Sequence, residues 1–95
     1  MGTSVIRYQV RPEAAEENQR LVEGVFTALA ATAPPGLRYT SLRLADGVTF
    51  VHVVDGEGLL DLPAFREFQR GLGDRLAEGP VRDDGTLVGA YPPAL

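Results

Sequence analysis

Residues 37–54, LRYTSLRLADGVTFVHVV, have the pattern of a β-hairpin. Two runs rich in β-branched and other apolar residues, Leu37–Leu44 and Val48–Val54, flank the tripeptide Ala45-Asp46-Gly47. An Asp-Gly pair between such runs is a strong signal of a tight turn, because glycine accepts the positive φ that these turns need. The segment therefore predicts two adjacent antiparallel strands.

The second strand of this hairpin carries apolar side chains on both of its faces. Its two alternating sets are Thr49, Val51 and Val53 on one face, and Phe50, His52 and Val54 on the other. An antiparallel sheet with one face in water normally shows a polar set on that face. We therefore expect both faces of this strand to be covered.

A strand and a helix are predicted before the hairpin. Residues Ser4–Arg11 alternate, with Ile6, Tyr8 and Val10 on one face, which is the period of a strand. A helix is predicted from Pro12 to about Ala31, where an apolar stripe at helical spacing consists of Leu21, Val22, Val25, Phe26, Leu29 and Ala30. Proline suits a first helical turn, so we expect the helix to begin there.

A second helix and a last strand are predicted after the hairpin. Asp61 is a plausible N-cap, the apolar stripe of Leu62–Leu76 follows it, and Glu78-Gly79-Pro80 would end the helix. A turn is expected at Asp83-Asp84-Gly85, and the last strand at Thr86–Tyr91.

The predicted order is βαββαβ over a single domain, residues 1–95. This is the α+β, ferredoxin-like arrangement, with both helices on one face of a four-stranded antiparallel sheet. Either Val51 and Val53, or Phe50 and Val54, would then remain in water, which forfeits roughly 1.5–3 kcal/mol for each side chain. The expected cover is a second copy, packed sheet to sheet in a homodimer that forms a dimeric α/β barrel. The alternative is that loops and arginine stems shield this face.

Composition excludes several classes of protein. The 95 residues hold 9 basic and 13 acidic side chains, a net charge of −4, which does not favour binding to nucleic acid or to an anionic membrane. Cysteine is absent and histidine occurs once, so we expect no disulfide, no thiolate nucleophile and no bound metal. No apolar run approaches a membrane span, and Met1 to Arg7 lacks the core of a signal peptide, so the expected location is the cytoplasm.

The chain resembles the antibiotic-biosynthesis-monooxygenase-like (ABM) domains of the dimeric α/β-barrel superfamily. Four stretches spread over nearly the whole chain carry the resemblance: Val5-Ile6-Arg7-Tyr8-Gln9-Val10-Arg11-Pro12-Glu13, Leu37-Arg38-Tyr39, Phe50-Val51-His52-Val53, and Leu62-Pro63-Ala64-Phe65-Arg66-Glu67-Phe68-Gln69. These motifs are structural, so they specify the fold and the dimer better than the chemistry.

The resemblance implies a pocket between the helices and the sheet of each protomer, and an oxygenase activity on polycyclic aromatic substrates that needs no cofactor. Oxygenases of this group typically place a Trp, an Asn and tyrosines in that pocket. This chain has no Trp, and its only Asn is Asn18 on the first predicted helix. Haem-degrading relatives use a helical His, whereas His52 falls on a strand, which disfavours that activity.

His52 and Tyr8 are the candidate catalytic residues. An unperturbed histidine titrates near neutrality, so His52 could accept a proton and form a substrate carbanion that reacts with oxygen. Tyr8 shares a strand face with Ile6 and Val10 and has the apolar body and polar tip of a pocket wall. The structural alternative is that both side chains belong to the core and have their polar atoms satisfied there.

Aromatic side chains supply the candidate ligand-binding set. Its members are Tyr39, Phe50, Phe26, Phe65 and Phe68. Phe65 and Phe68 also have the spacing of an ordinary helix core, which is compatible with a pocket walled by core residues.

The sequence thus predicts a small ABM-like protein that binds an aromatic or polyketide-like metabolite, with two alternatives for its role. It is either a cofactor-independent monooxygenase or a non-catalytic dimeric binding or accessory module. An RNA-recognition domain has the same βαββαβ order, and Asp46–Val53 superficially resembles its third-strand motif. Val48 and Val53, however, stand where stacking on bases needs aromatic rings.

Overall fold

Four antiparallel strands form one sheet in the computed structural model, which describes residues 2–92. In chain order they are β1 (Thr3–Val10), β2 (Arg38–Arg43), β3 (Thr49–Asp55) and β4 (Leu76–Gly85). Their order across the sheet is β2-β3-β1-β4, so that β2 and β4 are the edges. The register places Tyr8 of β1 opposite Phe50 of β3, and Ser41 of β2 opposite His52.

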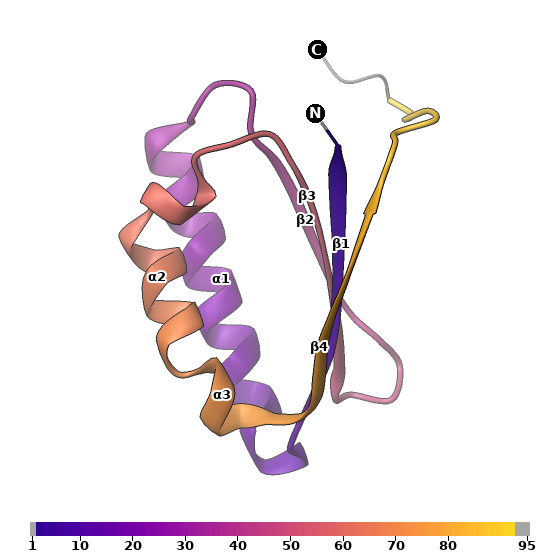
Figure 1. Cartoon of the computed structure of the whole chain (residues 1–95). Helices are drawn as coiled ribbons and strands as arrows, with labels where there is room; N and C mark the ends of the chain where they lie inside the picture. Colours follow the sequence, from indigo (N-terminus) through magenta and orange to yellow (C-terminus); the bar gives the residue numbers. More distant parts are fainter. Residues whose placement is uncertain (1, 93–95) are drawn as a thin grey trace.

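All helices lie on one face of this sheet (Figure 1). A short 3-10 turn, η1 (Pro12–Ala14), leads into the long helix α1 (Ala15–Thr32). After the hairpin come η2 (Leu59–Asp61), α2 (Pro63–Arg70) and the single turn α3 (Leu72–Arg75). The chain therefore has the predicted α+β, ferredoxin-like fold; a 3-10 turn starts at the predicted proline, and α1 itself starts at Ala15.

The core lies between this helical layer and the inner face of the sheet. Its buried side chains come from both layers: Tyr8, Val10, Ala15, Val22, Val25, Phe50, Leu59, Leu62 and Phe68. Alternation along β1 and β3 points Tyr8, Val10, Phe50 and His52 toward the helices. The inner face is thus the one that carries the candidate catalytic residues.

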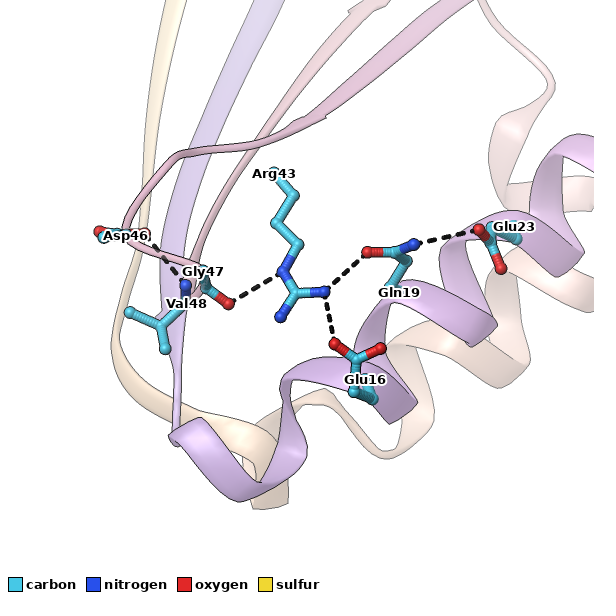
Figure 2. Close-up of polar contacts among 7 residues, drawn as sticks. All are labelled: Glu16, Gln19, Glu23, Arg43, Asp46, Gly47 and Val48. Atoms are coloured by element: carbon cyan, nitrogen blue, oxygen red, sulfur yellow. Dashed lines mark hydrogen bonds and ion pairs between the residues drawn. The ribbon is translucent and has the colours of Figure 1, made fainter.

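The predicted hairpin is confirmed, and polar contacts fix its turn (Figure 2). Asp46 Oδ1 accepts hydrogen bonds from the backbone N–H of Val48 and of Thr49, at 3.0 and 2.9 Å. These bonds and the one from the Thr49 hydroxyl, which has the largest effect, hold the pKa of Asp46 below its usual value. Gly47 has φ +79°, the left-handed conformation that the Asp-Gly turn requires.

Arg43 ties the hairpin to helix α1. Its Nε donates to the Gly47 carbonyl at 2.9 Å, and its Nη1 donates to Glu16 Oε1 at 2.7 Å and to Gln19 Oε1 at 2.8 Å (Figure 2). Gln19 in turn donates to Glu23 at 3.2 Å. This end of the hairpin is therefore attached to the helical layer by charged and polar contacts.

The prediction for the last strand was wrong. Strand β4 spans Leu76–Gly85 and includes the segment Asp83-Asp84-Gly85 that was expected to turn, whereas Thr86–Ala90 has no regular structure. An edge strand with nine of its ten residues exposed needs no apolar alternation, and this absence concealed it. Pro80, which lacks an N–H, is tolerated because β4 is an edge strand and its pairing with β1 is irregular between Arg7 and Gln9.

The end and the cap of the second helix were also predicted wrongly. Helix α2 ends at Arg70 and α3 at Arg75, well before Glu78-Gly79-Pro80. Gly71 and Gly73 disfavour a continuous helix, since each costs ~1 kcal/mol relative to alanine. Asp61 closes η2 instead of capping the helix; the N-cap is Leu62, which makes no side-chain capping bond.

Within residues 2–92, no helix lies over the outer face of the sheet (Figure 1). Cross-strand neighbours there include Val5 opposite Val53 and Leu42 opposite Val51. Leu42 and Val81 are 52% and 59% exposed, and Val5 is also exposed. The apolar face that the helices leave uncovered is therefore the one with Val51 and Val53, not the one with Phe50 and Val54.

Candidate functional site

His52 stands at the centre of a hydrogen-bonded cluster on the inner face of the sheet. Its Nε2 lies 2.7 Å from the Tyr8 hydroxyl oxygen. Its Nδ1 lies 2.5 Å from the Tyr39 hydroxyl and 2.7 Å from Ser41 Oγ. The strand register explains this grouping, because Ser41 is directly opposite His52 in β2, and Tyr8 lies two residues past its partner Ile6 in β1.

Asn18 and Arg75 extend the cluster into the helical layer. Asn18, fully buried on α1, donates from Nδ2 to the Tyr8 hydroxyl at 2.9 Å. Arg75, at the end of α3, donates from Nε to Asn18 Oδ1 at 3.0 Å. The cluster is therefore continuous from Arg75 through Asn18 and Tyr8 to His52, and on to Tyr39 and Ser41.

Aromatic rings surround the imidazole. The His52 ring is nearly parallel to the Tyr8 and Tyr39 rings, with centroids 5.3 and 5.5 Å away. The Phe68 ring is tilted against it at 5.6 Å, and Phe65 meets Tyr39 edge-on at 6.3 Å. These rings keep His52 out of solvent, so only 3% of its surface is exposed.

A cavity of about 810 Å³ opens next to this cluster, between the sheet and α2. Tyr8, Tyr39 and His52 line it together with Phe65 and Phe68. Ile6, Val54, Leu59 and Leu72 add apolar wall, and Glu57, Asp61, Gln69 and Arg82 add polar groups. A mostly apolar space of this size with a few converging polar groups has the character of a small-molecule site.

Gly56 shapes one wall of this cavity. It follows β3, has φ +97°, and a Cβ there would overlap the Gly36 carbonyl. Only glycine allows the two loops to approach so closely.

Burial controls the protonation of the cluster. It lowers the pKa of His52 to about 4 and raises the pKa of Tyr39 to about 12. It also raises the pKa of Tyr8, an effect that the hydrogen bond from Asn18 partly opposes. Near neutral pH the imidazole is uncharged and both phenols are protonated, so one imidazole nitrogen is a hydrogen-bond acceptor.

The depressed pKa of His52 predicts an acid-sensitive fold. An unfolded histidine binds its proton near pH 6.5 and the folded one near pH 4, so unfolding is favoured as pH falls between these values and the effect is constant below them. The expected loss is about 3 kcal/mol in the free energy of unfolding, at 1.36 kcal/mol for each pKa unit. Urea titrations from pH 7 to pH 4 measure it.

The variant His52→Gln is the control for this measurement, because glutamine does not titrate. Its stability is expected to fall less than that of the natural chain over the same pH range. Equal slopes in the two proteins would assign the acid sensitivity to the carboxylates instead.

The cavity brings together most of the aromatic candidates from the sequence. Tyr8, Tyr39, His52, Phe65 and Phe68 line it. Phe50 is not among the lining residues; its ring stacks on Tyr8 with centroids 5.7 Å apart. Phe26 stacks on Tyr39 at 5.0 Å and lines a second, smaller cavity of about 320 Å³ near the end of α1.

Sequence reasoning assigned no role in the site to Asn18, Arg75 or Ser41. Asn18 is buried on α1 between Ala15 and Val22, and the available signal was its position four residues before Val22 of the predicted apolar stripe. Ser41 shares the inner face of β2 with Tyr39, as the alternation implied. Arg75 gave no such signal, because it lies in a helix whose end was predicted wrongly.

No helix within residues 2–92 is long and apolar enough to cross a bilayer. No group of three or more His, Cys, Asp or Glu side chains in this range is arranged to hold a metal ion.

Comparison with known proteins gives matches to solved structures alone. No protein-family model and no curated protein sequence matches the chain. Rv0793 from Mycobacterium tuberculosis aligns with a TM-score of 0.71 and 21% identity, over 96% of this chain and 99% of the other. A putative antibiotic biosynthesis monooxygenase from Nitrosomonas europaea aligns with a TM-score of 0.76 and 14% identity, over 93% and 99%.

SnoaB, a cofactor-independent oxygenase from Streptomyces nogalater, also aligns over nearly the whole chain. Its TM-score is 0.67 and its identity 21%, with 96% of each chain covered. At these identities the alignments establish the fold. They confirm the predicted ferredoxin-like fold, which is similar to the folds of solved antibiotic biosynthesis monooxygenase proteins, as the sequence resemblance implied.

Proposed function

We propose that this protein is a cofactor-independent monooxygenase that acts on an aromatic or polyketide-like metabolite in the 810 Å³ cavity. The observation that carries the proposal is the buried His52, held between the hydroxyls of Tyr8 and Tyr39 where the cavity meets the sheet. The similarity in fold to SnoaB, a cofactor-independent oxygenase, supports the same reaction class.

The chemistry begins with an acidic C–H group of the substrate. A CH₂ next to aromatic rings and conjugated to a carbonyl loses a proton to the His52 cluster and becomes a carbanion, whose charge is shared with the carbonyl oxygen. The hydroxyl group of Tyr39 lines the cavity and can donate a hydrogen bond to that oxygen. The aromatic walls exclude water from the anion.

Dioxygen is the oxidant and supplies the new oxygen atom. The carbanion forms a C–O bond to O₂, and the resulting peroxide anion takes back one proton. Loss of water from the hydroperoxide carbon leaves a ketone, so that CH₂ and O₂ give C=O and H₂O. The cluster ends in its starting protonation state.

A second candidate function, a non-catalytic binding module, is favoured by one observation. A histidine whose pKa is about 4 is a weak base, and both of its ring nitrogens already have hydrogen-bond partners in the protein. Such a cluster can recognise a phenolic ligand without removing a proton from carbon.

Oxygen uptake with an anthrone-type hydroxylated tricyclic compound tests the two functions. Monooxygenation predicts consumption of one O₂ for each substrate molecule, above the background of heat-denatured protein. A rise in the melting temperature with the same compound, but no uptake above background, favours the binding module. Absence of both effects would refute both functions.

We also propose that the protein is a homodimer joined through the outer face of the sheet. The uncovered apolar side chains there, among them Val5, Leu42 and Val81, support this assembly. A second copy of the same face is the simplest cover, since a twofold axis brings identical patches together.

A further inference from the structure

Arg75 carries a buried positive charge whose hydrogen-bond partners are neutral. It is 5% exposed, and it donates to Asn18 Oδ1 and, from Nη2 at 2.9 Å, to the Phe68 carbonyl. Its guanidinium carbon lies 5.3 Å from the centre of the Phe68 ring. Over residues 2–92 no carboxylate forms a salt bridge with it. Buried charges are ordinarily paired, so this arrangement calls for a role.

The guanidinium fixes the direction of the next two hydrogen bonds. Arginine can only donate, so the oxygen of the Asn18 amide must face Arg75 and its NH₂ group must face Tyr8. The Tyr8 oxygen therefore accepts from Asn18. Its one hydrogen is then free for its other partner, Nε2 of His52, at 2.7 Å.

The opposite direction of the hydrogen bond between Tyr8 and His52 would leave the Tyr8 hydroxyl hydrogen without an acceptor. If Nε2 carried the hydrogen and donated to Tyr8, the Tyr8 oxygen would accept twice. Its own hydrogen would then have no acceptor among the side chains that contact it, because Asn18 presents only N–H groups to it. Unmet donors in a buried site are disfavoured.

We propose that Arg75 is a positioning residue that, through Asn18 and Tyr8, holds His52 in the tautomer with hydrogen on Nδ1. Nδ1–H then donates to Tyr39 or Ser41, which lie 2.5 and 2.7 Å away. When Tyr39 accepts this bond, its own hydroxyl hydrogen is available to the cavity. Each hydrogen bond in the series is then donated in the same direction, from the charged Arg75 through Asn18, Tyr8 and His52 to Tyr39, whose hydroxyl donates into the cavity.

This direction specifies the chemistry of the ligand atom at that point. A hydroxyl donor at the end of such a chain suits an oxyanion, such as the enolate or phenolate oxygen of the aromatic substrate. This consequence rests on the proposed function, whereas the tautomer of His52 does not.

The single histidine makes the tautomer directly measurable. In uniformly ¹⁵N-labelled protein at pH 7, a two-bond ¹H–¹⁵N correlation spectrum distinguishes the protonated ring nitrogen from the bare one. We expect Nδ1 to be protonated and Nε2 to be bare in the natural chain. The reverse pattern would overturn the proposal.

The variant Asn18→Asp is expected to reverse the tautomer. A carboxylate has no N–H, so it accepts from Arg75 on one oxygen and from the Tyr8 hydroxyl on the other. The Tyr8 oxygen can then accept only from His52, which moves the imidazole hydrogen to Nε2. An Asn18→Asp protein that keeps hydrogen on Nδ1 would contradict the mechanism.

Substitution of Arg75 supplies an independent pair of variants. Arg75→Met removes the donor and is expected to give a mixture of tautomers, because the Asn18 amide can then rotate. Arg75→Lys retains a charged donor and is expected to restore the Nδ1–H form. Equal spectra for the two variants would refute the role of Arg75, and this pair decides the question if Asn18→Asp does not fold.

The outcomes separate this inference from the proposed activity. The predicted tautomers without any oxygen uptake would leave the role of Arg75 intact and refute the monooxygenase. Oxygen uptake with the opposite tautomer would refute only the role of Arg75.

Discussion

Replacing His52 by glutamine is expected to lower the rate of oxygen uptake at least ~100-fold, the low end of what a positioned acid–base group contributes. Glutamine keeps an uncharged side chain that can bond to Tyr8 and Tyr39, but it has no useful affinity for a proton. The substrate therefore still binds, and the effect is expected in kcat more than in KM. Initial rates from an oxygen electrode, over a range of substrate concentrations, measure both constants.

Glu23→Gln is the matched control for this variant. Glu23 is an exposed residue on α1 and does not line the cavity, so its replacement is expected to leave both constants unchanged. A His52→Gln protein that turns over at the natural rate would remove His52 from the mechanism, even if oxygen uptake by the natural chain were established.

Val53→Asp is expected to dissociate the proposed homodimer. Val53 lies on the outer face, opposite Val5, and a twofold interface would bury two new carboxylates without partners. The dissociation constant is expected to rise at least ~1,000-fold, which corresponds to about 4 kcal/mol. Light scattering at micromolar concentration is expected to give twice the 10.2 kDa chain mass for the natural protein and the chain mass itself for the variant.

Two further variants test whether this effect belongs to the outer face. Leu42→Asp, on an exposed part of edge strand β2, is expected to dissociate the dimer without disturbing the core. Thr27→Asp, on the exposed side of α1, is expected to leave the mass unchanged. A natural chain that scatters as a monomer, or a Val53→Asp protein that remains dimeric, would refute the sheet-face assembly.

The parts of the fold that depend on strong local patterns were predictable from the sequence. An Asp-Gly pair between two strands strongly favours a tight hairpin turn. The alternation in Ser4–Arg11 matches strand β1 closely. The last strand was not predictable in this way. Residues Leu76–Gly85 form β4 because they pair with the edge of strand β1, which is a tertiary contact. Such pairing does not require alternating apolar residues in an exposed strand, so no sequence pattern indicated it.

The residues of the candidate site also divide into those that a local pattern predicts and those that depend on tertiary contacts. His52, Tyr8 and Tyr39 were recognisable because alternation places them on the inner faces of predicted strands. Asn18 and Arg75 join them through contacts across 10 and 57 positions of sequence. Spacing within one element cannot reveal such contacts, and the wrong end of the second helix concealed the position of Arg75.

The wide separation of these partners also bears on when the site comes into existence. The hydrogen bond between Tyr8 and His52 spans 44 residues, and Arg75 belongs to the last helical turn before the final strand. A growing polypeptide that has left the ribosome only as far as the hairpin therefore lacks the cationic end of the chain of donors. The hydrogen bonds that connect Arg75 through Asn18 and Tyr8 to His52 can therefore form only after the second helical segment has been synthesised.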